Sequence, residues 1–348
     1  MRKTVEIPLP GHPDKVCDVI VDSILDEYLR RDRQSHVDIQ ALGSHGMLMI
    51  GGSVESQADF DSGELAKVVY KKLGYDDEIE PFVNIDVKRE HKVNQFHNGA
   101  CHGTSVVHGY ATRETREMLP RVLVYANALA QRIDDLRRTS DLFHWMNPDG
   151  KVQLTMDGEK AVSVAAHVQH KRDIDVSHVQ QMLVEHAIIP VLGEVEGLKI
   201  FVNTAGKFSD GGFEGGSGAS GRRMLSDTYG GLLPSGGAYL SGRDPHHPSR
   251  AGAYMARYAA KQFVHEGVAG NVFITVAYTI GQADPIYVDA RTGDGKDISD
   301  SVKKRFDFRT EAIVERLKLS EPMYAGLATF GQFGRLQTPW EQIEGETS

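Results

Sequence analysis

The chain has 348 residues, of which 40% are hydrophobic, and it carries a formal net charge of −9. A chain of this length and composition can bury a substantial core in two or three compact units. The acidic balance argues against a general nucleic-acid binder, which needs a basic surface, but it is compatible with a local basic pocket for a small anion.

The cysteines and the N-terminal segment indicate the compartment. Cys17 and Cys101 are too few for a disulfide framework in a chain of this length, so a reducing compartment is the simpler interpretation. The segment 1–15 has no apolar run after its basic residues, and no apolar stretch reaches membrane-spanning length. The sequence therefore predicts a cytoplasmic protein that does not bind membranes.

The first predicted element is a helix over 14–28. Its apolar residues Val16, Ile20, Ile24 and Tyr28 recur at a spacing typical of one buried helical stripe.

The middle and end of the chain alternate between strand and helix patterns. Strands are expected at 45–54 and 82–87, and the polar segment 91–103 is long enough to be a functional loop. The elements expected after that loop are a helix at 120–138, a strand at 162–168, and then a helix at 177–191, a helix at 250–265, a strand at 271–280 and a helix at 310–317. A helix with strands in each third of the chain predicts three α+β layers, each a sheet with helices on one face.

The segment 204–221 is rich in glycine and is expected to be irregular. Within it, 216–221 matches the G-x-G-x-x-G pattern, but no strand precedes it, as a dinucleotide-binding site would require. The following Arg222 and Arg223 do not fit a P-loop, which needs Lys and then Ser or Thr. Glycines followed by arginines still favour phosphate binding, with a flexible loop beside a solvated basic patch as the alternative.

Several stretches, taken together, resemble one enzyme family. The four longest are 11–15 (GHPDK), 220–231 (SGRR running into DTYGG), 241–258 (SGRDP and the helix after it) and 330–341 (FGQFGR and PWE). With shorter matches in the same order between them, they make the chain similar to the methionine adenosyltransferases, or S-adenosylmethionine synthetases, over nearly its whole length. It resembles a divergent member.

The resemblance implies an α+β fold of three domains related by pseudo-threefold symmetry. Each domain would be a mixed or antiparallel sheet with helices on one face. The expected units are an N-terminal domain at 1–98, a central domain at 99–205 and a C-terminal domain at 206–348. It also implies a homodimer, or a dimer of dimers, that pairs through flat sheet faces and has its active sites at the interface.

The resemblance also implies a reaction, in which the methionine sulfur attacks C5′ of ATP and the leaving tripolyphosphate is then hydrolysed. Mg²⁺ and K⁺ are the expected cofactors. His12 would hydrogen-bond the leaving oxygen, Phe208 would pack on the adenine, and Asp14 would hold Mg²⁺. The residues that would act in catalysis are His12, Lys151, Arg222, Arg223, Arg243 and His247. The residues that would bind ATP are Glu6, His12, Asp149, Lys151, Lys207, Phe208, Arg222, Arg223, Tyr239, Arg243 and Ile280.

Each of these residues has a plain structural alternative. His12 before Pro13 could only shape a turn, Asp14 could only cap the following helix, and Lys151 could be a solvated loop lysine. Arg222 and Arg223 could be a surface pair.

The sequence departs from the family pattern at two kinds of position. Gln40 replaces a glutamate associated with the monovalent cation, and Ser249 replaces the aspartate of a second Mg²⁺ site. The positions expected around the amino-acid substrate are also changed, and they are Ser53, Arg89, His102, Gly103 and Gly216.

These departures leave the residues expected to bind ATP recognisable, whereas the residues expected to bind the acceptor are changed. Fewer acidic groups remain there to pair with the ammonium group of methionine. Methionine is the default acceptor, with Glu55, Glu90 and Glu214 as compensating carboxylates. The alternatives are a different nucleophile, or a weakly active or non-catalytic partner subunit.

A transition-metal site is a further possibility in and near the polar loop. Its candidates are His91, His97, Cys101, His102 and His108. Their spacing matches no usual zinc pattern, so ordinary loop residues are the preferred interpretation.

Overall fold

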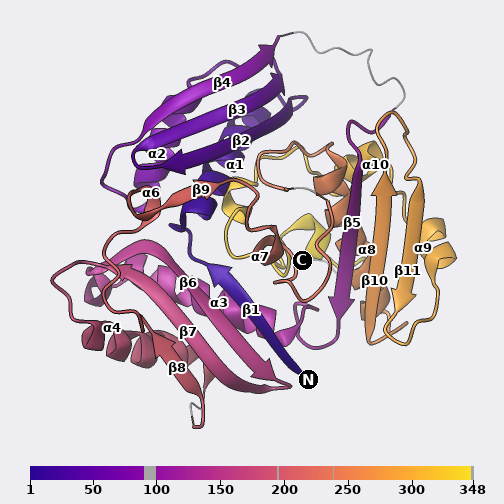
Figure 1. Cartoon of the computed structure of the whole chain (residues 1–348). Coiled ribbons are helices and arrows are strands. Elements are labelled where there is room, and N and C mark those ends of the chain that lie inside the picture. The colour runs from indigo at the N-terminus through magenta and orange to yellow at the C-terminus, as the bar shows by residue number, and fades with distance from the viewer. Residues whose placement is uncertain (90–98, 194–195, 238, 346–348) are drawn as a thin grey trace.

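The structure is a computed structural model that describes residues 1–89, 99–193, 196–237 and 239–345. Within these residues, three sheets surround a centre that holds α7 (Met224–Asp227) (Figure 1). No helix in these ranges is long and apolar enough to cross a membrane.

The first sheet has the order β4-β3-β2-β9. Its strands are β2 (His36–Ser44), β3 (Met47–Glu55), β4 (Glu80–Lys88) and β9 (Ser217–Ala219). Helices α1 (Pro13–Arg31) and α2 (Ser62–Leu73) pack against it.

The second sheet has the order β1-β6-β7-β8. Its strands are β1 (Arg2–Pro8), β6 (Met146–Asp157), β7 (Lys160–His170) and β8 (Lys199–Val202). Helix α3 (Arg121–Thr139) packs on β1 and β6. A helical stretch follows β7, made of α4 (Val176–Leu183), a π-turn (Val184–Ile188) and α5 (Ile189–Leu192), and it contacts α3 and β8.

The third sheet has the order β11-β10-β5. Its strands are β5 (Ser105–Thr112), β10 (Asn271–Tyr278) and β11 (Tyr287–Thr292). Helix α8 (Pro248–His265) packs on β5 and β10, α9 (Ser299–Arg305) contacts β11, and α10 (Thr310–Arg316) contacts α8.

The three α+β layers expected from the sequence are thus confirmed, but each sheet includes a strand from another part of the sequence. β1 joins the sheet of the central segment, β5 joins the sheet of the C-terminal segment, and β9 joins the N-terminal sheet. The contiguous units 1–98, 99–205 and 206–348 stay predictions, and neighbouring units share strands across their boundaries.

The predicted helices and strands occur within a few residues of their expected positions. The strand expected at 45–54 starts later, because His45 and Gly46 have positive φ values of 46° and 77° and form the turn before β3. Of the expected loop 91–103, residues 91–98 lie outside the described part of the chain, as does Glu90.

The expectation that 204–221 is wholly irregular was wrong. It contains α6 (Gly212–Gly215) and β9, which pairs antiparallel with Leu42–Ser44 of β2. A Cβ at Gly218 would stand 2.1 Å from the Pro13 backbone, so the missing side chain lets β9 lie against the start of α1.

The centre of the molecule is held by buried charged groups on α1 and α8. Lys15 Nζ contacts Asp18 at 2.8 Å and Asp227 at 2.6 Å, which ties α1 to α7. Arg250 of α8 pairs with Asp22 of α1 at 2.7 Å, and both side chains are fully buried. Buried charges are tolerated only when they are paired, so these contacts specify how the helices pack.

Candidate active site

Six of the predicted site residues come together at the junction of the first two sheets. We call them the Asp14 cluster, and they are Glu6, His12, Asp14, Lys151, Arg222 and Arg223. Glu6 lies on β1 and Lys151 on the neighbouring β6, His12 and Asp14 begin α1, and the two arginines follow β9. Three distant parts of the chain therefore supply this cluster.

Arg223 is the centre of the cluster. Its Nε donates to Asp14 Oδ2 at 2.8 Å, its Nη1 lies 3.3 Å from Glu6 Oε1, and its Nη2 lies 3.1 Å from His12 Nε2. Asp14 is almost fully buried, and its other oxygen accepts the Ala219 N–H at 3.0 Å. Glu6 Oε2 also lies 3.5 Å from Lys151 Nζ. The second arginine, Arg222, lies 3.4 Å from Asp14 Oδ1, which is farther than the 2.8 Å between Arg223 and Asp14 Oδ2. The cluster therefore places three cations around two carboxylates.

His12 is held as a neutral imidazole. Its Nδ1 accepts the Asp14 N–H at 3.2 Å as the N-cap of α1, and its Nε2 faces the Arg223 guanidinium. Burial first, and then the positive charge of Arg223, lower the pKa of His12 to about 4. Above that pH the ring can therefore donate one hydrogen bond and accept another.

The His12 pKa can be measured directly. In an NMR titration, the His12 ring resonances are expected to shift with a midpoint near 4 instead of the ordinary 6.5. The Arg223→Ala variant is expected to raise this midpoint without restoring 6.5, because burial remains the larger cause. A wild-type midpoint near 6.5 would contradict the buried, cation-flanked geometry.

A cavity of about 310 Å³ opens beside the Asp14 cluster, and Asp149, Phe208 and Gly216 line it as well. Asp149 Oδ2 accepts the Gly212 N–H at 2.8 Å, and burial raises the pKa of its carboxyl to about 6. The wall thus offers an aromatic ring and a carboxyl next to a group of cations.

The other predicted phosphate and cation positions form a second group. We call it the Arg243 cluster, and its members are Gln40, Tyr239, Arg243, His247 and Ser249. The Arg243 guanidinium lies 4.0 Å from the centre of the Tyr239 ring, and its Nη1 lies 2.9 Å from His247 Nε2 and 3.2 Å from Ser249 Oγ. Gln40 donates to the Tyr239 hydroxyl at 2.6 Å.

His247 begins α8 as His12 begins α1. Its Nδ1 accepts the Ser249 N–H at 3.2 Å, and burial followed by the charge of Arg243 lowers the pKa of His247 to about 4. A Cβ at Gly103 would stand 2.7 Å from His247 Nε2, so this glycine is needed for the close approach of the ring. His247 is therefore uncharged at neutral pH, and Arg243 is the cation that the cluster offers to a phosphate.

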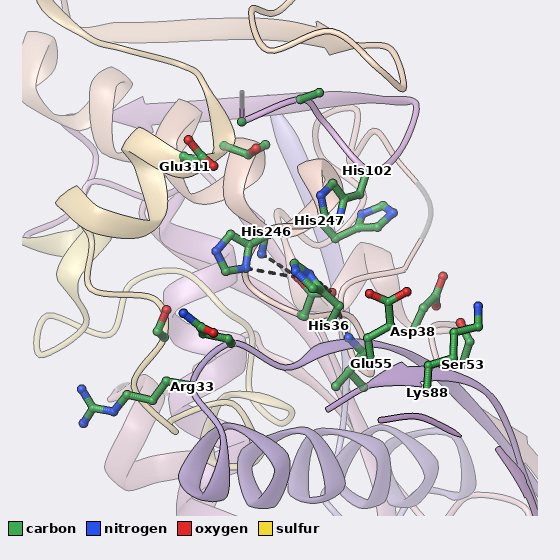
Figure 2. A pocket seen from close by; sticks show the side chains of 17 residues that line it. Arg33, His36, Asp38, Ser53, Glu55, Lys88, His102, His246, His247 and Glu311 are labelled. Carbon is green, nitrogen blue, oxygen red and sulfur yellow. Dashed lines mark hydrogen bonds and ion pairs between the residues drawn. The ribbon is translucent and has the colours of Figure 1, made fainter. Parts of the chain in front are cut away.

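His247 of the Arg243 cluster lines a cavity of about 780 Å³ (Figure 2). Ser53, Gly99 and His102 also line it. The charged lining residues are Arg33, Asp38, Glu55, Lys88, Asp244 and Glu311. This cavity is polar and larger than the one beside the Asp14 cluster.

Comparison with known proteins identifies the family. Three family models match in sequence order, described as the N-terminal domain of S-adenosylmethionine synthetase at 2–97, the central domain at 98–208 and the C-terminal domain at 210–342. The chain belongs to the S-adenosylmethionine synthetase family.

Curated members of the S-adenosylmethionine synthetase family match nearly end to end. The S-adenosylmethionine synthase of Petrotoga mobilis is 33% identical over 99% of this chain and 96% of its own length. S-adenosylmethionine synthase 1 of Rhodopseudomonas palustris is 35% identical over 98% of this chain and 96% of its own length. The S-adenosylmethionine synthase of Aquifex aeolicus is 32% identical over 96% of this chain and 94% of its own length.

Three residues predicted from the family resemblance lie away from both cavities in the described structure. Arg89 contacts the Ala58 carbonyl at 2.6 Å and Asp59 Oδ1 at 2.8 Å. Lys207 Nζ donates to the Arg172 carbonyl at 2.7 Å, and Ile280 is exposed after the end of β10. Their predicted roles stay predictions, and the structure shows no contact between them and either cluster.

The Mg²⁺ assigned to Asp14 by family resemblance does not fit the donor atoms as they stand. Arg223 Nε donates to Asp14 Oδ2 at 2.8 Å and Arg222 lies 3.4 Å from Oδ1, so each carboxylate oxygen faces a positive charge that would oppose a bound cation. At the second expected position, the Ser249 hydroxyl bonds Ser105 Oγ at 2.9 Å, and a hydroxyl is a weak ligand for a hard cation. Beside Asp14, Arg222 and Arg223 supply the positive charge that a metal ion would otherwise supply to a phosphate.

Glu55, proposed from the sequence as a compensating carboxylate, lines the larger cavity, but Asp38, Asp244 and His246 beside it escaped the sequence analysis. Asp38 and Glu55 lie on β2 and β3 with their side chains on the same face as Ser53, and Asp38 pairs directly with Ser53 in the strand register. Alternation along β2 is the signal that could have placed Asp38 with His36 and Gln40. Asp244 and His246 were also missed, although they follow Arg243 in one short run.

The transition-metal group considered in the polar loop does not assemble among its described members. His108 bonds Thr275 at 3.1 Å on the third sheet, and the Cys101 thiol bonds the Gly103 carbonyl. His91 and His97 lie outside the described residues. His102 instead lies beside His36, with their ring centres 4.7 Å apart.

Proposed function

We propose that this chain makes S-adenosylmethionine from methionine and ATP, releasing tripolyphosphate and hydrolysing it to phosphate and pyrophosphate. One observation supports this proposal most strongly. Lys151, Arg222 and Arg223 converge with a neutral His12 around a cavity that Phe208 also lines. A polyphosphate leaving group needs cations, and its departing oxygen needs a hydrogen-bond donor.

The roles follow from this geometry. The methionine sulfur forms a bond to C5′ as the bond from C5′ to the phosphate oxygen breaks, and the electron pair goes to that oxygen. Bound phosphate would attract Arg223 away from His12 Nε2, which frees the imidazole N–H to donate to the leaving oxygen. Lys151, Arg222 and Arg223 would stabilise the charge that develops on the polyphosphate.

The larger cavity supports methionine as the acceptor. Ser53 lacks the carboxylate expected from the family, but Glu55 and Asp38 supply carboxylates to the same cavity. An ammonium group needs such counter-charges when it leaves water. No observation favours a different nucleophile or a non-catalytic partner subunit.

Exposed apolar side chains support a homodimer. Leu42, Met49 and Phe82 are paired across β2, β3 and β4, and their exposed fractions are 53%, 52% and 60%. An apolar row on an open sheet face favours burial against a second copy. We propose that each active site combines the Asp14 cluster of one subunit with the Arg243 cluster of its partner. The cytoplasmic location, Mg²⁺ and K⁺ remain proposals from the sequence.

This division of the site predicts complementation. His12→Ala and His247→Ala proteins are each expected to be nearly inactive as homodimers. After the two are mixed, unfolded together and refolded, heterodimers with one intact site should restore about a quarter of wild-type activity. Mixing without subunit exchange is the control. No recovery, in refolded material shown to contain heterodimers, would contradict a site shared between subunits.

The phosphate products test the proposed reaction. ³¹P NMR of the protein with ATP, methionine, Mg²⁺ and K⁺ is expected to show one phosphate and one pyrophosphate per turnover. Added tripolyphosphate should also be hydrolysed. Formation of ADP or AMP in place of these products would rule out transfer of the whole adenosyl group.

A further inference from the structure

Two histidines and an aspartate converge on the wall of the larger cavity. His36 begins β2, and Asp244 and His246 lie in the turn before α8. The rings of His36 and His246 lie side by side, with their centres 5.2 Å apart (Figure 2). His36 Nδ1 is 3.8 Å from Asp244 Oδ2, and His246 Nδ1 is 3.7 Å from Asp244 Oδ1. One ligand atom from each of the three residues lies within 4.8 Å of the other two. This is the one such group found among the described residues.

The two imidazole nitrogens that face the aspartate are buried without a hydrogen-bond partner in the described structure. Buried polar nitrogens are normally satisfied, so this pair needs an explanation. The Asp244 carboxylate is itself buried and fixed, because Oδ2 accepts the Val37 N–H at 2.9 Å and Oδ1 accepts the His246 N–H at 2.8 Å. Two unsatisfied nitrogens therefore point at one oriented carboxylate.

We propose that His36, Asp244 and His246 bind a divalent transition-metal ion of the Zn²⁺ class. Neutral imidazole nitrogens and a carboxylate oxygen are the donors that such ions take from proteins. Zn²⁺ bonds of about 2.0–2.1 Å to nitrogen place tetrahedral ligand atoms roughly 3.3 Å apart, so small side-chain movements would close the present spacing. The site is separate from the Asp14 position that the family resemblance assigns to Mg²⁺.

The chemistry of the three donors separates this ion from Mg²⁺ and K⁺. Hard cations prefer an all-oxygen shell, whereas two of these three ligands are imidazoles. Three protein ligands leave at least one coordination position for water or for a small molecule in the cavity. The ion would also join β2 to the turn that carries Arg243, because its ligands come from both segments.

The alternative is a metal-free ion pair, in which the histidines are protonated against Asp244. Burial opposes protonation of His36, but Asp244 first, and then Glu55 and Asp32, outweigh it, so the pKa of His36 is raised above its ordinary value. The His102 ring centre lies 4.7 Å from that of His36, and Arg33, Lys88 and His247 are further basic residues of the cavity wall. The ion pair requires no metal, so metal binding distinguishes the two states.

Binding of Zn²⁺ to the full chain tests the proposal. Protein freed of metal with a chelator is titrated with Zn²⁺ against a chromophoric competitor, and the bound metal is counted by elemental analysis. One Zn²⁺ per chain is expected. His36→Ala and His246→Ala should each weaken binding by about 100-fold or more, since each removes a ligand. His144→Ala, an exposed histidine on a different part of the surface, should bind as wild type does.

A second measurement needs no variant. The Co²⁺-loaded wild-type protein is expected to show visible ligand-field bands of nitrogen and oxygen coordination, and added Zn²⁺ should remove them. Circular dichroism checks that the variants are folded. The proposal is overturned if the wild-type chain binds no stoichiometric Zn²⁺ and gives no Co²⁺ bands, or if folded His36→Ala and His246→Ala proteins bind Zn²⁺ unchanged.

Discussion

Arg223→Ala is expected to lower kcat/KM for S-adenosylmethionine formation by about 10²–10³-fold, which corresponds to about 2.7–4 kcal/mol of transition-state stabilisation. Arg223 contacts Asp14, Glu6 and His12 at once, so its loss removes a phosphate cation and the group that orients the other three. Steady-state kinetics with ATP and methionine measure the effect.

Two further variants make this result specific. Arg223→Lys keeps the charge and is expected to recover part of the loss, although one ammonium cannot replace the forked contacts of a guanidinium. Arg2→Ala removes an exposed arginine paired with Asp157 and should leave kcat/KM unchanged. If Arg223→Ala is folded and as active as Arg2→Ala, the Asp14 cluster is not the phosphate site.

The largest expected loss of stability follows from breaking the Asp22–Arg250 pair. Asp22→Ala is expected to lower the free energy of unfolding by about 3–5 kcal/mol, because it leaves a buried guanidinium without its counter-charge. Asp22 Oδ1 also accepts the Gly242 N–H at 2.9 Å, so the same change loosens the turn before Arg243. Urea or thermal unfolding measures the loss.

The double variant Asp22→Leu/Arg250→Met separates charge from packing. Removing both charges should recover most of the stability lost in Asp22→Ala, because no unpaired ion stays buried. Glu64→Ala, which breaks an exposed pair with Lys67, should change stability by less than about 1 kcal/mol. A loss in Asp22→Ala as small as that of Glu64→Ala would mean that the buried pair does not hold α1 against α8.

Local patterns predicted individual elements well. The regular spacing of Val16, Ile20 and Ile24 predicted α1, because a helix places these residues on one face and the core covers them. The sharing of strands between units could not be predicted in this way. Pairing of β1 with β6 joins Arg2 to Asp157, and no local pattern encodes a partner so distant in the sequence.

The candidate site residues were proposed only because family resemblance supplied their roles. Resemblance proposed His12, Asp14 and Lys151, and the structure places them in one cluster. Resemblance could not show that Arg223 contacts both Asp14 and His12, because these contacts depend on how the turn after β9 packs against the start of α1. The carboxylate of Glu55 in the larger cavity likewise depends on the pairing of β2 with β3.

The most direct test of the proposed function is the identity of the nucleoside product. Purified protein is incubated with ATP, Mg²⁺, K⁺ and methionine carrying a ¹³C-labelled methyl group. The products are then separated and identified by mass spectrometry. Labelled S-adenosylmethionine is expected to form only when methionine is present and to be nearly absent with Arg223→Ala. ATP binding by the folded protein without any labelled S-adenosylmethionine would contradict the proposed function.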